Sequence, residues 1–188
     1  MRVISCSGLL LSTALVMFLS TSCKKEARDA TAEENLLSLQ QSKESTASGA
    51  KKTADEQLLK SVTQATSRFH STTQAINAGH VPDEHCVSLP GVGGMGFHWV
   101  NPTLVDPVFD PLKPEAVLYA PGPDGTLRLV ALEYIVINTG QPAPMFGSQP
   151  FDVGGTPIPA PHWSLHVWLY EDNPTGMFKP FNPNVSCQ

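Results

Sequence analysis

The sequence of residues 126–138, TLRLVALEYIVIN, decides the fold class of this 188-residue chain. It contains no glycine or proline and is rich in Val, Ile, Leu and Tyr, which is the composition of a β-strand. Its centre is apolar on both alternating faces, as is typical of a strand inside a sheet rather than at its edge. The turn sequence PGPDG at 121–125 precedes it and predicts a hairpin with a strand at 116–120.

Further β-prone runs lie at 96–100 and 162–170, separated by turn sequences rich in Asn, Pro and Gly. The chain holds 17 prolines and 14 glycines. So many prolines exclude a helical bundle, because proline breaks the interior of a helix. The sequence predicts a small antiparallel β-sheet or barrel with many Pro/Gly turns.

One helix is predicted before the strands, at about 54–78. Thr53 and Glu56 match a capping box at its start, and Gly79 stands where a helix-terminating glycine belongs. Between them, apolar residues recur every three or four positions, at Leu58, Val62, Ala65, Phe69 and Ile76. A single apolar stripe indicates that one face packs on the sheet. The expected fold class is therefore α+β, with one long N-terminal helix packed on the sheet.

The N-terminus reads as a targeting segment. Arg2 precedes an apolar run at 3–19, and small residues lead up to Cys23. This pattern resembles the lipobox of bacterial lipoproteins, although Leu19 lies four positions before the cysteine instead of the usual three. The resemblance implies a cleaved signal peptide at 1–22, a fatty-acyl (palmitate) lipid anchor on Cys23, and a place in the cell envelope, outside the cytoplasm. An ordinary secretory signal and a retained anchor are the alternatives.

The residues after Cys23 begin Lys24-Lys25-Glu26, which is similar to lipoproteins of Bacteroidota, some of which reach the outer membrane or cell surface. Residues 24–52 are polar and carry too few apolar groups to offset the entropy of ordering. We therefore expect a flexible tether at 23–52, joined to a single globular domain at 53–188.

The remaining cysteines fit an exported domain. Cys6 lies in the signal peptide, which leaves Cys86 and Cys187 as one disulfide or as two free buried thiols. Residues 81–188 hold three basic residues, Lys113, Arg128 and Lys179, against ten Asp or Glu. Nucleic acid is excluded as a partner, because binding a polyanion needs clustered Lys and Arg. The membrane, through the lipid, and a small ligand or an envelope protein remain as partners.

Candidate chemistry lies on the predicted strands. Glu133 is the one polar residue in an apolar row of the 126–138 strand, and a buried carboxylate needs a partner. The candidate partners are His98 and His166, with His162 and Trp168 at the rim of the same pocket. If both rings converge on Glu133, they offer a site for Zn, Fe or Mn. The alternatives are a structural Glu–His hydrogen bond and no convergence at all.

Two resemblances bear on function. The spacing of Gly155, Pro161 and His166 is similar to the second cupin motif, although Trp163 and Tyr170 replace its glycine and asparagine. The segments 94–102 and 165–187 resemble an uncharacterised family of exported bacterial proteins over residues 65–187, which implies no activity.

Two function classes follow. The first is a lipid-anchored envelope domain that binds a small ligand or a partner. The second is a metal-dependent enzyme of cupin-like type that uses His98, Glu133 and His166. The sequence has no Gly-x-Ser-x-Gly elbow or other nucleophile–base motif, which favours the binding domain.

Overall fold

A computed structural model describes residues 29–155 and 158–188. The predicted signal peptide and Cys23 lie outside these ranges. By its internal contacts the chain forms two units, residues 1–46 and 47–188. The described part of the first unit, 29–46, is helical. No helix among the described residues combines the length and the apolar character that a membrane span requires.

Helix α1 runs over Asp29–Thr66 and begins well before the predicted start. The expectation of a flexible tether over 29–52 is therefore wrong for these residues. They are rich in Ala, Glu, Gln, Lys and Leu, which favour helix even where no core covers them. Thr53 lies inside the helix, where its hydroxyl donates to the Gly49 carbonyl at 2.9 Å, so it caps nothing. Leu36, Leu37 and Leu39 are exposed on the helix surface.

The predicted single helix also breaks near its end. A 3₁₀ turn, η1 (Ser67–His70), is followed by a short helix, α2 (Thr72–Asn77), whose N-cap is Ser71. The break shifts the helical phase, so that Ala75 is buried and the predicted core residue Ile76 is 49% exposed. Gly79 follows α2 with a φ of 98°, as predicted for a terminating glycine.

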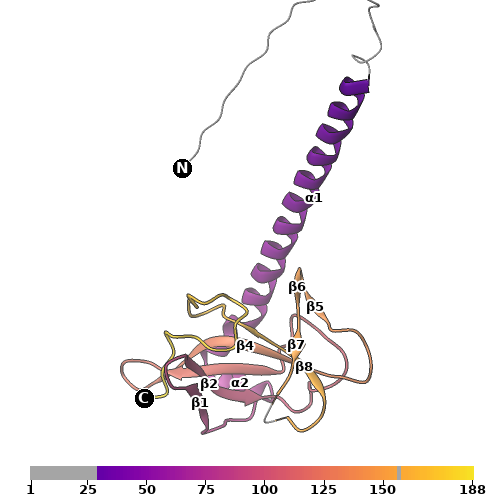
Figure 1. Cartoon of the computed structure of the whole chain (residues 1–188). Coiled ribbons are helices and arrows are strands. Elements are labelled where there is room, and N and C mark those ends of the chain that lie inside the picture. The colour runs from indigo at the N-terminus through magenta and orange to yellow at the C-terminus, as the bar shows by residue number, and fades with distance from the viewer. Residues whose placement is uncertain (1–28, 156–157) are drawn as a thin grey trace, which may run out of the picture. The chain divides into compact units, whose positions relative to one another are not determined.

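The remainder of the second unit is antiparallel β-structure, which confirms the α+β class (Figure 1). One six-stranded sheet has the order β1-β2-β3-β4-β8-β7, and β5 pairs with β6 in a separate two-stranded sheet. The strands are β1 (Cys86–Leu89), β2 (Gly93–Val100), β3 (Ala116–Pro121), β4 (Leu127–Ile137), β5 (Met145–Phe146), β6 (Gln149–Pro150), β7 (Asp152–Val153) and β8 (His162–Val167). Strand β4 lies between β3 and β8, as its two apolar faces predicted.

A β-bulge changes which side chains of β4 share a face. Leu118 of β3 pairs with Ala131, but the next residue, Tyr119, pairs with Leu129, which leaves Val130 as the extra residue. Strict alternation along the strand would put Leu129 on the face of Glu133. The bulge instead places Leu129 in the core on the opposite face.

The two faces of the sheet carry two apolar clusters. The first holds Val62 of α1, Phe69 of η1 and Ala75 of α2 together with sheet residues such as Val117, Tyr119 and Leu132. The Tyr119 hydroxyl donates to the Phe69 carbonyl at 2.6 Å and ties η1 to the sheet. The second cluster includes Ala116, Leu118, Ala131 and Ile135. The candidate site lies on this second face.

The C-terminal segment is fastened to the start of the sheet. Cys86 and Cys187 form the predicted disulfide, with their Cα atoms 5.7 Å apart. Asn182 forms an antiparallel bridge with Gly94. A Cβ at the neighbouring Gly93 would come within 2.3 Å of the Asn182 carbonyl oxygen, so this close approach requires glycine. A disulfide closing a loop of this length stabilises the fold by up to about 4–5 kcal/mol in the chain-entropy model.

Candidate metal centre

Strands β2, β4 and β8 bring His98, Glu133 and His166 together on one face of the sheet. Glu133 of β4 pairs directly with His166 of β8 in the antiparallel ladder. His98 lies on β2, which is separated from β4 by β3. The β3 residue opposite Glu133 is Ala116. The side chain of Ala116 is a single methyl group, which leaves room for the His98 ring to approach Glu133 across β3.

The ligand atoms of these three residues face one another. The Nε2 of His98 lies 3.6 Å from Glu133 Oε2, and the Nε2 of His166 lies 3.9 Å from Glu133 Oε1. The two Nε2 atoms are 3.4 Å apart. Both histidines named as candidate partners of Glu133 therefore approach its carboxylate.

This spacing fits a metal ion better than a simple hydrogen-bonded pair. An ion that binds N and O ligands tetrahedrally at roughly 2.0–2.2 Å holds its ligand atoms about 3.4 Å from one another. One ligand atom from each of the three residues lies within 4.8 Å of the other two. Two imidazoles and one carboxylate also form a donor set used by Zn²⁺, Fe²⁺ and Mn²⁺ in proteins.

The protonation states favour the same chemistry. Burial opposes the charge of Glu133, but His166, His98 and a hydrogen bond from Ser164 outweigh it and lower the pKa of Glu133. Burial lowers the pKa of His166, against the attraction of Glu133. At neutral pH the pair is thus a carboxylate and a neutral imidazole, the forms in which both bind metals. Their side chains are only 12% and 8% exposed.

Ser164 fixes the carboxylate from the neighbouring position on β8. Its hydroxyl donates to Glu133 Oε1 at 2.7 Å. Since Oε1 is engaged by this bond, Oε2 is the oxygen left facing His98. Sequence reasoning missed this role, although the alternation of β8 already placed Ser164 on the face of His162 and His166.

The three residues line a cavity of about 660 Å³, within the usual size range of small-molecule sites. Its walls are largely apolar and come from β1, β2, β4, β7 and the C-terminal segment. They include Val87, Met95, Val100, Ile135, Val153, Ile158, Phe178 and Phe181. Asp83, His85 and Asp152 add polar groups to this lining. The candidate metal ligands are therefore open to a molecule in the cavity.

Of the two residues predicted at the cavity rim, His162 lines the cavity and Trp168 does not. His162 lines the cavity but is buried, with Nδ1 against the Ala160 carbonyl at 2.8 Å. Its ring lies so close to Gly154 that a Cβ there would come within 2.0 Å of Nε2. The rim position predicted for Trp168 is wrong. Strand β8 ends at Val167, and Trp168 is buried, with Nε1 donating to the Lys179 carbonyl at 2.6 Å.

A second buried carboxyl, Glu115, was missed by sequence reasoning. It directly precedes β3, is 2% exposed, and its Oε2 accepts a hydrogen bond from the Ile135 backbone N–H at 3.0 Å. This bond replaces a ladder partner, because β3 begins only at Ala116. Burial raises the pKa of Glu115 to about 8, so it is protonated at neutral pH. The sequence feature that could have identified Glu115 is its position directly before the apolar run AVLYA at 116–120.

Replacing Ser164 with alanine is expected to weaken metal binding roughly tenfold, because loss of a group that orients a ligand typically costs 10–100-fold in affinity. The measurement is a competition titration of Zn²⁺ against a chelating dye. Ser88→Ala, an exposed serine on β1, is the matched control and should leave the affinity unchanged. Equal affinities for Ser164→Ala and Ser88→Ala would show that the carboxylate needs no such support.

A comparison of the chain with protein-family models, with curated protein sequences and with solved structures found no match.

Proposed function

We propose that the domain binds one divalent transition-metal ion through His98, Glu133 and His166, and that a small molecule coordinates this ion from the cavity. The observation that carries the proposal is the convergence of the two Nε2 atoms and the Glu133 carboxylate within 4.8 Å of one another. Three protein ligands leave at least one position of a four- to six-coordinate ion free. In this site the free position faces a largely apolar cavity.

The donor set restricts the ion. Imidazole nitrogens suit Zn, Fe, Mn and related metals, whereas Ca²⁺ and Mg²⁺ prefer sites made of oxygen ligands. Zn²⁺ favours four-coordinate tetrahedral geometry, and the 3.4 Å between the two Nε2 atoms matches the ligand spacing of such an ion. Fe²⁺ in a two-histidine, one-carboxylate set is the closest competitor.

The test is the metal content and the metal affinity of the purified protein. The proposal expects one equivalent of Zn²⁺ or Fe²⁺ to be retained through dialysis, or to bind again after chelation, with release on acidification as the ligands take up protons. Protein that remains free of metal after exposure to each of these ions under anaerobic conditions would contradict it.

Enzymatic use of the same ion is the second candidate. It is favoured by one observation, the free coordination positions that open on a cavity large enough for a substrate. A catalytic metal site keeps such a position for water or substrate, whereas a structural site closes it with protein ligands. The cupin-like enzyme considered from the sequence belongs to this class.

We also propose that Cys23 carries a lipid that holds the domain in the cell envelope. The support is the lipobox-like sequence before Cys23 and the cysteines that pair outside it. Cys23→Ser should move the protein from the membrane fraction to the soluble fraction, which immunoblotting of fractionated cells measures. Cys6→Ser, which changes a cysteine within the segment to be removed, should leave it in the membrane fraction. Unchanged membrane attachment of Cys23→Ser would contradict the anchor.

A further inference from the structure

The charges around the cavity have one sign. Three carboxylates, those of Asp83, Glu133 and Asp152, line it, and none of its described lining residues is Lys or Arg. A divalent ion would balance two of these three negative charges. An anionic ligand would meet no Lys or Arg side chain among the described lining residues.

The three basic residues of 81–188, which are Lys113, Arg128 and Lys179, lie outside the cavity lining. Lys113 pairs with Asp110 at 2.9 Å, and Arg128 pairs with Glu171. Neither pair lines the cavity. Lys179 stands between two lining residues, Phe178 and Pro180, but is itself absent from the lining. Three carboxylates therefore line the cavity, whereas the basic residues of 81–188 lie outside its lining.

Asp83 and Asp152 contribute charge at solvent-accessible positions. Asp83 is partly exposed, and its Oδ1 accepts hydrogen bonds from the backbone N–H of His85 at 2.9 Å and from the ring Nδ1 at 2.8 Å. These bonds, and more weakly His98, lower the pKa of Asp83, so it is ionised at neutral pH. Asp83 lines the same cavity as the three candidate metal ligands. Asp152, on β7, is exposed.

We infer that the ligand of this cavity binds the ion at one end and has an apolar body that is neutral or cationic, without an anionic group away from the ion. This inference rests on the proposed metal site and specifies its substrate class. The apolar walls would hold the body of the molecule by burying it. The carboxylates would repel a ligand carboxylate or phosphate and attract an ammonium group.

The test uses three para-substituted benzohydroxamic acids whose group at the far end of the ring is cationic (aminomethyl), neutral (methyl) or anionic (carboxylate). The hydroxamate is the metal-binding group in all three, so its contribution cancels. Calorimetric titration into the full-chain, Zn²⁺-loaded protein is expected to rank the affinities aminomethyl, methyl, carboxylate. The methyl compound should bind about tenfold more tightly than the carboxylate. Metal content is measured before and after each titration, so that stripping of the ion is detected.

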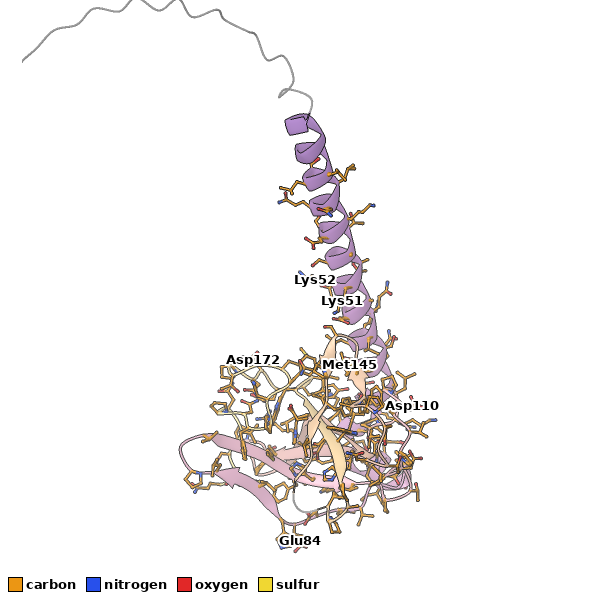
Figure 2. The ribbon with its side chains drawn as sticks, turned by 45° about the vertical axis from the view of Figure 1, so that its right-hand side comes forward. Lys51, Lys52, Glu84, Asp110, Met145 and Asp172 are labelled. Carbon is orange, nitrogen blue, oxygen red and sulfur yellow. A yellow bond between two sulfur atoms is a disulfide. The ribbon has the colours of Figure 1, made fainter. Side chains whose placement is uncertain are left out.

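Charge variants show whether the named carboxylates cause the ranking. The double variant Asp83→Asn, Asp152→Asn should shrink the difference between the methyl and carboxylate compounds to about threefold or less. Asp110→Asn removes one carboxylate outside the cavity lining and is the control, which should keep the full difference (Figure 2).

The outcomes separate the two proposals. If the protein binds metal but the carboxylate compound binds as well as the methyl compound, or none of the three binds, the inferred substrate class is wrong and the metal site stands. An undiminished difference between the methyl and carboxylate compounds in the double variant would also overturn the inference, because the named charges would not be its cause. If no metal is bound at all, the proposed function itself fails.

Discussion

Glu133→Gln is expected to lower the affinity for Zn²⁺ by at least about 100-fold. Removing a group that merely orients a ligand costs 10–100-fold, so removing a direct, charged ligand should cost more. The substitution keeps the size of the side chain and the hydrogen-bonding reach to Ser164. It removes the negative charge that compensates the ion in a site where Glu133 is 12% exposed. The measurement is competition with a chelator of known affinity.

His166→Gln should produce a loss of similar size, because it removes one of two imidazole ligands while leaving the carboxylate. The control is His85→Gln, which removes an exposed imidazole that lines the same cavity but stands outside the group of three. It should change the affinity less than about threefold. Thermal unfolding of each variant shows whether it is folded. A folded Glu133→Gln protein that binds Zn²⁺ as tightly as His85→Gln would contradict the assignment of Glu133.

The second large effect concerns Glu115 and the pH dependence of stability. The pKa of its carboxyl is raised from 4.5 to about 8 by burial. In the folded protein the carboxyl therefore keeps its proton up to about pH 8, whereas in the unfolded chain it loses the proton near pH 4.5. Between these values the folded state binds more protons, so the free energy of unfolding falls as pH rises. The contribution of this group is fully present below pH 4.5 and is lost by about pH 8.

Glu115→Gln should remove this dependence, because an amide stays neutral and its oxygen can still accept from the Ile135 N–H. Relative to this variant, the wild-type protein is expected to lose up to about 1.4 kcal/mol of unfolding free energy per pH unit, and a few kcal/mol in total. Urea denaturation from pH 5 to pH 8, with the disulfide intact and metal removed by a chelator, measures the difference. Metal removal prevents pH-dependent metal binding from contributing to the difference.

Glu84→Gln supplies the control for this experiment. Glu84 is exposed on the loop before β1 and points away from the domain (Figure 2). The change removes the same formal charge without removing a buried group. Its stability curve should run parallel to that of the wild-type protein. Parallel curves for Glu115→Gln as well would show that Glu115 ionises as freely in the folded protein as in the unfolded chain.

The sheet and the pairing of its central strands follow from the sequence because their signals are local. A run without glycine or proline and rich in Val, Ile and Leu indicated β4, and a Pro–Gly turn indicated the hairpin before it. Glu133 could be singled out for the same reason, as one charge in an apolar row. His98 could be named as a partner of Glu133 only from its residue type. No local sequence signal shows that Ala116 allows the His98 ring to reach Glu133 across β3.

The differences between prediction and structure arise from long-range or irregular features. At the bulge, the β4 residues before Val130 switch to the opposite face of the sheet. No turn residue in the sequence marks this bulge. The break at Ser71 resets the helical phase through one capping hydroxyl within a run that is otherwise helix-forming. Trp168 follows the alternation of β8 in sequence but leaves the strand, because its backbone N–H pairs with the Met177 carbonyl. The bulge and the end of β8 depend on partners elsewhere in the chain, whereas the break at Ser71 depends on a local cap.

The most direct test of the metal centre is anomalous diffraction from crystals of the Zn²⁺-loaded protein, recorded at the zinc absorption edge. The account predicts one anomalous peak on the β2–β4–β8 face of the sheet, roughly 2.0–2.2 Å from His98 Nε2, His166 Nε2 and a Glu133 carboxylate oxygen. It also predicts a further ligand to the ion on the cavity side. A peak bound by other residues, or no peak at these three in protein shown to contain zinc, would contradict it.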